Sequence, residues 1–183
     1  MEFPTSEFWN YSSQMWSLPE VENTCLDLQN QHDLNVNLLL FCCWTGEQQS
    51  RLDEKQIKTL IEAAEPWETV IKPLRSSRNV MKQQLIAMPA ELIDQTLKNI
   101  TEMELNAERM QQMSLEKSIS PEEFSDCDSE SVIECSLVNL KCYIDQLNLQ
   151  SAEGIDAQLG QLLNHLYQDE EAVQMAMMSC MAN

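Results

Sequence analysis

The sequence predicts an all-α fold: a compact multi-helix bundle with an acidic helical C-terminal extension. Only three glycines and six prolines occur among the 183 residues, which is fewer turn-forming residues than sheet-rich folds use. Leu, Gln, Glu, Met and Ala are frequent, and all of them favour helices. The hydrophobic fraction of 43% is enough to form a core.

Two helices are predicted before residue 33. Residues 8 to 16 carry aromatic and aliphatic side chains at helical spacing, and Thr5 or Ser6 is the expected N-cap. A second helix is expected to begin near Pro19, because the missing N–H of proline costs little in the first turn of a helix.

Residues 34–44 are apolar except for Asn35 and Asn37. As a helix this segment would be roughly 17 Å long, too short for the roughly 30 Å core of a bilayer, so we interpret it as a central core helix. Asp33 is the predicted N-cap and Gly46 the predicted C-terminal stop. Asn37 has two interpretations: it ties the first turn to neighbouring backbone, or it lines a polar spot at the mouth of a pocket.

The middle of the chain predicts three further helices. Asp53 is expected to cap the first of them, and Pro66 to lie at the start of the next. Pro73 falls inside that second pattern and is expected to kink or break it. A long amphipathic helix is predicted from Pro89 to about Lys117.

The last third of the chain differs in composition. Residues 118–131 are acidic and serine-rich, which indicates a linker or loop. We therefore expect a helical bundle domain over residues 1–117, able to fold alone, and an acidic linker with a helical extension over 118–183. Apolar residues at alternating spacings of four and three over 133–147 predict a helix, with 159–167 as its expected hairpin partner.

The formal net charge of −19 bears on possible partners. A field this negative repels nucleic acid and anionic membranes, so we expect neither as a partner. The opening residues MEFPTSEF have neither the basic start nor the long apolar segment of a signal peptide. With an odd number of cysteines, seven, this predicts reduced thiols and a cytoplasmic protein.

Catalytic, metal-binding and cofactor-binding motifs are not found in the sequence. Glycines are not clustered as phosphate-binding loops require, and neither C-x-x-C nor H-E-x-x-H occurs. Cys25 or Cys42 with His32 could form a thiol–imidazole pair, but a core role for the cysteines is the preferred interpretation. We assign no catalytic residue, no metal ligand and no cofactor.

One concentration of positive charge stands out in this acidic chain. Four basic residues, here called the basic ridge, follow each other at helical spacing: Lys72, Arg75, Arg78 and Lys82. Either they pair with acidic residues of the long helix or the C-terminal segment, or they dock an acidic partner or an anion.

Several separated motifs resemble one known family. They are FWNYS (8–12), PEV (19–21), CLDLQ (25–29), VNLLLF (36–41) with Trp44, and Trp67 followed by PLRSSR (73–78). Together they resemble an uncharacterised proteobacterial family, domain of unknown function 2390, over about residues 7–113. The resemblance implies a small cytoplasmic helical protein and brings no activity, cofactor or catalytic residue.

Two functions follow as hypotheses. The first is a non-enzymatic cytoplasmic adaptor that docks a protein partner through the basic ridge. The alternative is a small-ligand binder or enzyme with a pocket near Asn35, Asn37, Trp44 and Arg75. An enclosed cavity with convergent Asn and Arg side chains would favour the ligand, whereas a flat basic ridge would favour the protein partner.

Overall fold

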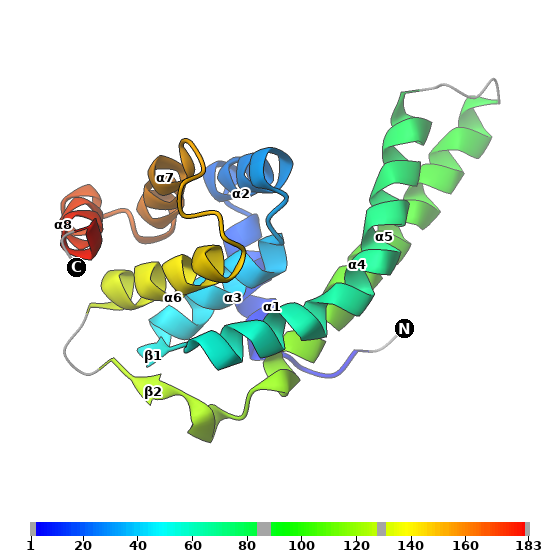
Figure 1. The fold of residues 1–183 in the computed structure, drawn as a ribbon. Coiled ribbons are helices and arrows are strands. Elements are labelled where there is room, and N and C mark those ends of the chain that lie inside the picture. Colours follow the sequence, from blue (N-terminus) through cyan, green and yellow to red (C-terminus); the bar gives the residue numbers. More distant parts are fainter. Residues whose placement is uncertain (1–2, 84–88, 128–130, 182–183) are drawn as a thin grey trace.

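The all-α prediction is confirmed by a computed structural model, which describes residues 3–83, 89–127 and 131–181. Within these ranges the chain forms eight helices and one short antiparallel pair of strands (Figure 1). The helices are α1 (Glu7–Trp16), α2 (Pro19–His32), α3 (Val36–Glu47), α4 (Glu54–Lys82), α5 (Ala90–Ser118), α6 (Val132–Gln146), α7 (Ile155–Tyr167) and α8 (Glu170–Met181).

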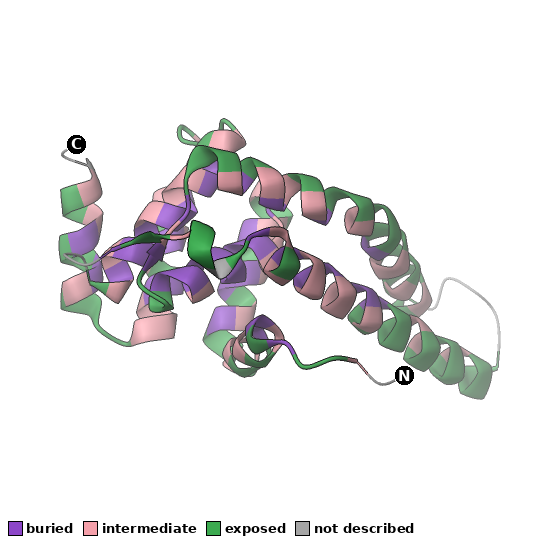
Figure 2. Cartoon of the chain, turned by 90° about the horizontal axis from the view of Figure 1, so that it is seen from below, coloured by how far each residue is buried: buried purple, intermediate pink, exposed green. Residues whose placement is uncertain are grey.

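Helices α1, α2, α4, α5 and α6 contact α3, and α8 lies at the periphery (Figure 1). Helix α6 packs mainly against α3, while α7 packs mainly against α2 and to a smaller extent against α6, its predicted partner. Helices α4 and α5 form a long antiparallel hairpin that projects from the rest of the molecule. Buried residues gather near the base of this hairpin, and its far end is mostly exposed (Figure 2). Among the described residues, the hairpin therefore has a packed base and a mostly exposed far end (Figure 2).

Helix α3 is the central core helix that its all-round apolar sequence predicts. Leu39 and Cys43 are fully buried, and the ring of Phe41 meets that of Phe8 edge to face at 5.0 Å between centroids. No helix among the described residues has both the length and the apolar character of a membrane span.

The predicted N-cap of α3 is wrong by two residues. Asn35 caps the helix, since its side-chain oxygen accepts a hydrogen bond from the Leu38 backbone N–H at 3.1 Å. Asp33 instead ends α2 in the left-handed conformation, with φ of 54°, which Asp tolerates better than most residues. The tight turn between α2 and α3 therefore takes Asp33 out of capping position.

The predicted stop at Gly46 is also wrong, because α3 continues to Glu47. Gly46 lies where α3 crosses α6. A Cβ atom built on Gly46 would lie 2.0 Å from the Ser136 Oγ atom and 2.6 Å from the Ser136 Cα atom. The glycine is therefore required by close packing of two helices and not by a turn.

The start of a separate helix predicted at Pro66 is wrong, and of the kink or break predicted at Pro73 the break does not occur. Helix α4 runs from Glu54 to Lys82 with Pro66 and Pro73 inside it, and it curves in Figure 1. A proline in a helix interior removes one hydrogen bond and bends the helix. Here α5 packs along α4, and we infer that this packing keeps the bent helix continuous.

The predicted linker is partly ordered structure. After α5 the chain forms a short 3-10 helix (Pro121–Glu123) and the strand β2 (Ser125–Asp126), which pairs antiparallel with β1 (Ser50–Arg51). The following cysteine, Cys127, is joined to Cys135 of α6 by a disulfide. This bond differs from the reduced thiols that the sequence predicts for all seven cysteines. Residues 128–130 of the predicted linker lie outside the described residues.

One hydrophobic cluster extends across the predicted domain boundary at residue 117. It contains Leu39 and Phe41 of α3 together with Leu137 and Leu140 of α6. Independent folding of residues 1–117 stays a prediction, and the shared core argues against it, because part of that core would be missing.

We expect the disulfide to contribute measurably to stability. The double variant Cys127→Ala/Cys135→Ala should lose about 2–3 kcal/mol of unfolding free energy, because the bond restricts the unfolded chain. Urea denaturation with and without dithiothreitol measures this loss: the reductant should destabilise the parent chain and leave the variant unchanged. A thiol titration in denaturant without reductant should find five reactive thiols, and finding seven would contradict the disulfide.

Candidate functional site

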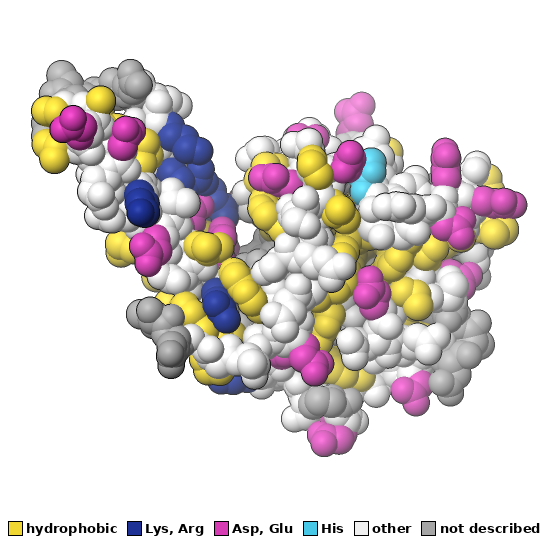
Figure 3. Space-filling model, turned by 180° about the vertical axis from the view of Figure 1, so that it is seen from behind, with side chains coloured by type: hydrophobic (Ala, Val, Ile, Leu, Met, Phe, Trp, Pro, Cys, Tyr) yellow, Lys and Arg dark blue, Asp and Glu magenta, His cyan; other side chains and the backbone are white. Residues whose placement is uncertain are grey.

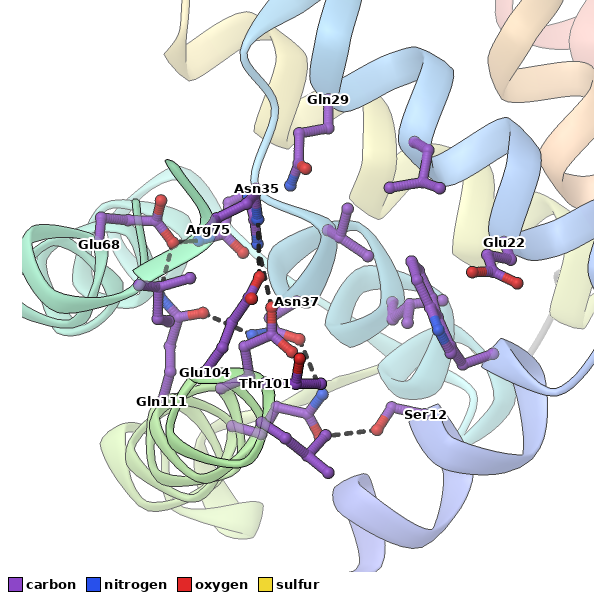
Figure 4. Close-up of a pocket in the computed structure, with 18 of the residues that line it drawn as sticks. Ser12, Glu22, Gln29, Asn35, Asn37, Glu68, Arg75, Thr101, Glu104 and Gln111 are labelled. Carbon is purple, nitrogen blue, oxygen red and sulfur yellow. Dashed lines mark hydrogen bonds and ion pairs between the residues drawn. The ribbon is translucent and has the colours of Figure 1, made fainter. Parts of the chain in front are cut away.

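A cleft of about 750 Å³ lies between the α4–α5 hairpin and helices α1, α2 and α3. Figure 3 shows the hollow beside the projecting hairpin, with Lys and Arg side chains along the hairpin side. Figure 4 shows the side chains that converge on it. This volume is within the range of small-molecule sites, and we call the space the hairpin cleft.

Amide side chains form one part of the cleft wall (Figure 4). The Asn37 Nδ2 atom donates to Gln111 Oε1 at 2.5 Å, and Gln112 Nε2 donates to Asn37 Oδ1 at 2.7 Å. The Ser12 hydroxyl donates to Gln112 Oε1 at 2.6 Å. Asn37 thus links α3 to α5 through side chains and not through backbone groups, and it also lines the cleft.

This network makes Asn37 a residue whose loss should destabilise the fold. In Asn37→Leu, the buried amides of Gln111 and Gln112 lose their partner, which should lower the unfolding free energy by about 1–3 kcal/mol. Urea denaturation followed by circular dichroism measures the change. The matched control is Asn30→Leu, because Asn30 lines the same cleft but is exposed. Its effect should stay within about 0.5 kcal/mol, and equal effects of the two variants would contradict this role.

Glu68 of α4 is held in the cleft by neutral groups. Its Oε1 atom accepts hydrogen bonds from Asn35 Nδ2 at 2.7 Å and from Gln111 Nε2 at 3.1 Å. Within the described residues, no cationic side chain forms a salt bridge with Glu68. Its negative charge therefore faces the cleft without a counter-charge in contact.

The two arginines of the basic ridge are paired with α5. The Arg78 guanidinium donates from Nε to Glu104 Oε2 at 2.6 Å and from Nη2 to Glu104 Oε1 at 3.1 Å. The Arg75 guanidinium bonds Glu104 Oε1 at 3.2 Å and Glu108 Oε1 at 3.0 Å. Hydrogen bonding to Glu104 raises the pKa of Arg78, whereas burial raises the pKa of Glu108 against the opposing charge of Arg75. Two positive and two negative charges are thus held in one network.

The other two ridge residues differ from the arginines. Lys72 forms an exposed salt bridge with Asp33 at 3.0 Å, while Lys82 lines the cleft. Within the described residues, Lys82 forms no salt bridge. Three of the four basic ridge residues are therefore paired with acidic residues of the same chain. Pairing within the chain is the first of the two interpretations of the ridge.

The structure brings together three of the four residues predicted to form a pocket. Asn35, Asn37 and Arg75 line the hairpin cleft. Trp44 does not: its ring packs on Phe8 and Phe41, with centroids 5.4 and 5.3 Å away. Trp44 is half-buried and packs against the hydrophobic core.

Sequence reasoning missed the contribution of α5 to the cleft. Four carboxylate or amide residues of this helix line it at spacings of four, three and one, namely Glu104, Glu108, Gln111 and Gln112. Three of them are buried, the exception being Glu108, which is half-buried. No signal in the sequence points to this, because a long amphipathic helix is expected to carry such residues on its solvent face.

The thiol–imidazole pair considered from the sequence is not poised for catalysis. Burial raises the pKa of Cys25 to about 12 and that of Cys42 above its usual range, so both thiols stay protonated at neutral pH. The His32 ring is hydrogen-bonded to Gln158 at 2.9 Å. The described residues contain no group of three or more His, Cys, Asp or Glu side chains placed to hold a metal ion.

Comparison with known proteins gives a family and no function. No curated protein and no solved structure matches the chain. A family described as "Protein of unknown function (DUF2390)" matches residues 7–115, close to the range of the resemblance in the sequence motifs. This range includes every residue that lines the hairpin cleft. Because the match covers more than half of the chain, the protein belongs to the DUF2390 family.

Proposed function

We propose that this protein is a non-catalytic binding protein that holds a small molecule in the hairpin cleft. The observation that carries the proposal is the convergence of Asn35, Asn37, Arg75 and Arg78 on a single cleft of about 750 Å³. A concave site with a few fixed polar groups is typical of small-molecule binding. The amide network and the salt bridges hold these groups in place before any ligand binds, which reduces the entropic cost of binding.

The pairing of the basic ridge favours this function over the docking of an acidic protein. The side chains of Arg75 and Arg78 are only 26% and 22% exposed, and both bond to Glu104. An acidic partner would therefore compete with a buried carboxylate that already satisfies them. Three of the four ridge residues, Arg75, Arg78 and Lys82, line the cleft and do not form a separate flat surface.

The Ser12 hydroxyl of the cleft is not placed to act as a nucleophile. Ser12 donates its proton to the amide oxygen of Gln112 at 2.6 Å and also bonds the Trp9 carbonyl oxygen at 3.1 Å. A serine nucleophile needs an adjacent base that takes its proton, and neither an amide nor a carbonyl oxygen does so. This serine is therefore a structural group.

Blocking the cleft tests the proposal. Leu105 lines the cleft and is 50% exposed, so Leu105→Trp should fill part of the cavity without disturbing the core. The matched control is Leu92→Trp, on the same helix and 54% exposed, but outside the lining of the cleft. Each protein is equilibrated with a metabolite mixture, and retained molecules are identified by mass spectrometry after desalting.

The parent chain and Leu92→Trp should retain the same molecules, and Leu105→Trp should lose them. If the parent chain retains no small molecule, or if Leu105→Trp retains the same set, the hairpin cleft is not the binding site that we propose.

A further inference from the structure

We propose that the ligand of the hairpin cleft is an aliphatic polyamine, that is, an alkyl chain carrying two or more ammonium groups. This inference rests on the proposed function and adds the chemical class of the ligand. It follows from the charges that remain in the cleft after the internal salt bridges are taken into account.

The charges of the cleft are unevenly compensated. Its lining holds four carboxylates, and those of Glu104 and Glu108 bond to the two arginines. The carboxylates of Glu22 and Glu68 and the ammonium group of Lys82 remain, and none of the three forms a salt bridge within the part of the chain that the structure describes. The unpaired charges of the lining are therefore two negative and one positive, and negative charge is in excess. A ligand that bears positive charge supplies the missing counter-charges.

The two uncompensated carboxylates lie on opposite sides of the cleft. Glu68 projects from α4 and Glu22 from α2 (Figure 4). The lining also includes apolar side chains from α1, α2 and α3, namely Trp16, Leu26, Val36 and Leu40. A polyamine matches this pattern, because its ammonium groups are separated by methylene groups that favour apolar contact. The indole of Trp16 is in addition a surface that attracts cations.

Glu68 is the better-defined of the two anchors. Its Oε1 atom already accepts two amide hydrogen bonds, which fix the carboxylate. Within the described residues, Oε2 accepts no hydrogen bond from another side chain. An ammonium group donating to this oxygen would form a charge-assisted hydrogen bond. The net charge of −19 raises the local concentration of cations around the molecule and favours their association.

An anionic ligand fits the same cleft poorly. It would approach the two uncompensated carboxylates, and at Arg75 or Arg78 it would compete with Glu104, which is only 6% exposed. Lys82 is the one basic residue of the lining that forms no salt bridge within the described residues. Leaving a buried carboxylate without its partners is costly. The pairing within the hairpin thus selects against negative charge.

Calorimetric titration with spermidine, an aliphatic triamine, tests the inference in about 0.15 M salt, where diffuse charge effects are screened beyond about 8 Å. The key variant is Glu68→Gln, which keeps an acceptor oxygen for Asn35 and Gln111 but removes the charge. We expect its affinity to fall about tenfold or more. The control is Glu62→Gln, an exposed position of α4 outside the cleft, whose affinity should stay within about twofold of the parent value.

A second comparison separates charge from shape. An alkyl diamine should bind, whereas the alkyl diol of the same length should not, and Leu105→Trp should abolish spermidine binding. Thermal unfolding without ligand establishes that each variant is folded.

Equal losses in Glu68→Gln and Glu62→Gln would show diffuse attraction to an acidic protein and would overturn the inference. It is also overturned if spermidine does not bind while the metabolite mixture yields neutral or anionic molecules that Leu105→Trp loses. That second result would leave the proposed function standing, whereas retention of no molecule at all would remove both.

Discussion

A chain that ends at Lys117 is expected to lose cooperative unfolding, because α3 would then expose the face that α6 covers. The truncation removes fully or almost fully buried side chains of α6 and α7, among them Leu137, Leu140, Leu159 and Leu162. Burying one such side chain contributes about 1.5–3 kcal/mol. The loss of several therefore amounts to a large part of the roughly 5–15 kcal/mol that stabilises a typical domain.

Polar contacts would be lost with the same truncation. Asn139 of α6 is fully buried, and its side chain accepts a hydrogen bond from the Leu52 backbone N–H at 2.8 Å. It also donates to Thr45 Oγ1 at 3.1 Å and to the Ser50 carbonyl oxygen at 2.9 Å. Asn139 therefore holds the end of α3 and the strand β1 together. Without it, these groups would be left without their partner.

Urea denaturation followed by far-ultraviolet circular dichroism measures the outcome. The full chain should unfold in one sigmoidal transition, and the truncated chain should show a gradual change and bind a hydrophobic dye. This result would be opposite to the independent folding that the composition break at residue 118 predicts. A truncated chain with a sharp transition near the midpoint of the full chain would support the boundary at residue 117.

Replacing Gly46 by alanine is the second change with a large expected effect. The added Cβ atom would lie 2.6 Å from both the Cα and the backbone N atom of Ser136, so rotation of the serine side chain does not relieve the overlap. Helices α3 and α6 would have to move apart at the centre of the core. We expect a loss of about 3 kcal/mol or more, at the upper end of overpacking effects.

Gly160→Ala is the matched control for Gly46→Ala. Gly160 also lies inside a helix, α7, but its added Cβ atom would be 4.0 Å from the Met177 Cγ atom, an ordinary contact. Alanine is the better helix former by about 1 kcal/mol, so this variant should be as stable as the parent chain or slightly more stable. Thermal and urea unfolding measure both variants. Similar stabilities for the two would show that α3 and α6 are not closely packed at Gly46.

The fold class could be predicted because it depends on patterns that act within a few residues. Helix α3 is packed against other parts of the chain on most of its surface. The length and composition of its apolar run are enough to predict this position in the core. The errors occur where tertiary packing decides. Pro73 is accommodated because α5 supports α4, and Gly46 is needed by a helix that lies ninety residues further along the chain.

Only those residues of the candidate site that differ in polarity or charge from the sequence around them could be predicted. Asn37 stands out in an apolar run, and Arg75 and Arg78 stand out in an acidic chain. Gln111 and Glu104 do not stand out, because a long amphipathic helix is expected to carry such residues on its solvent face. Which face of α5 turns toward α3 is set by contacts between distant segments, and the spacing of residues does not contain that information.

The width of the hairpin cleft depends on the angle at which the projecting α4–α5 hairpin leaves the rest of the molecule (Figure 1). Helices α4 and α5 each have 29 residues and are thus about 40 Å long at about 1.5 Å per residue. Because only the base is packed against the rest of the molecule (Figure 2), a tilt of a few degrees at the base would change the opening at the far end of the described helices by several ångströms. Any contact that favours one tilt of the hairpin would then change the affinity for a ligand of the cleft that favours another.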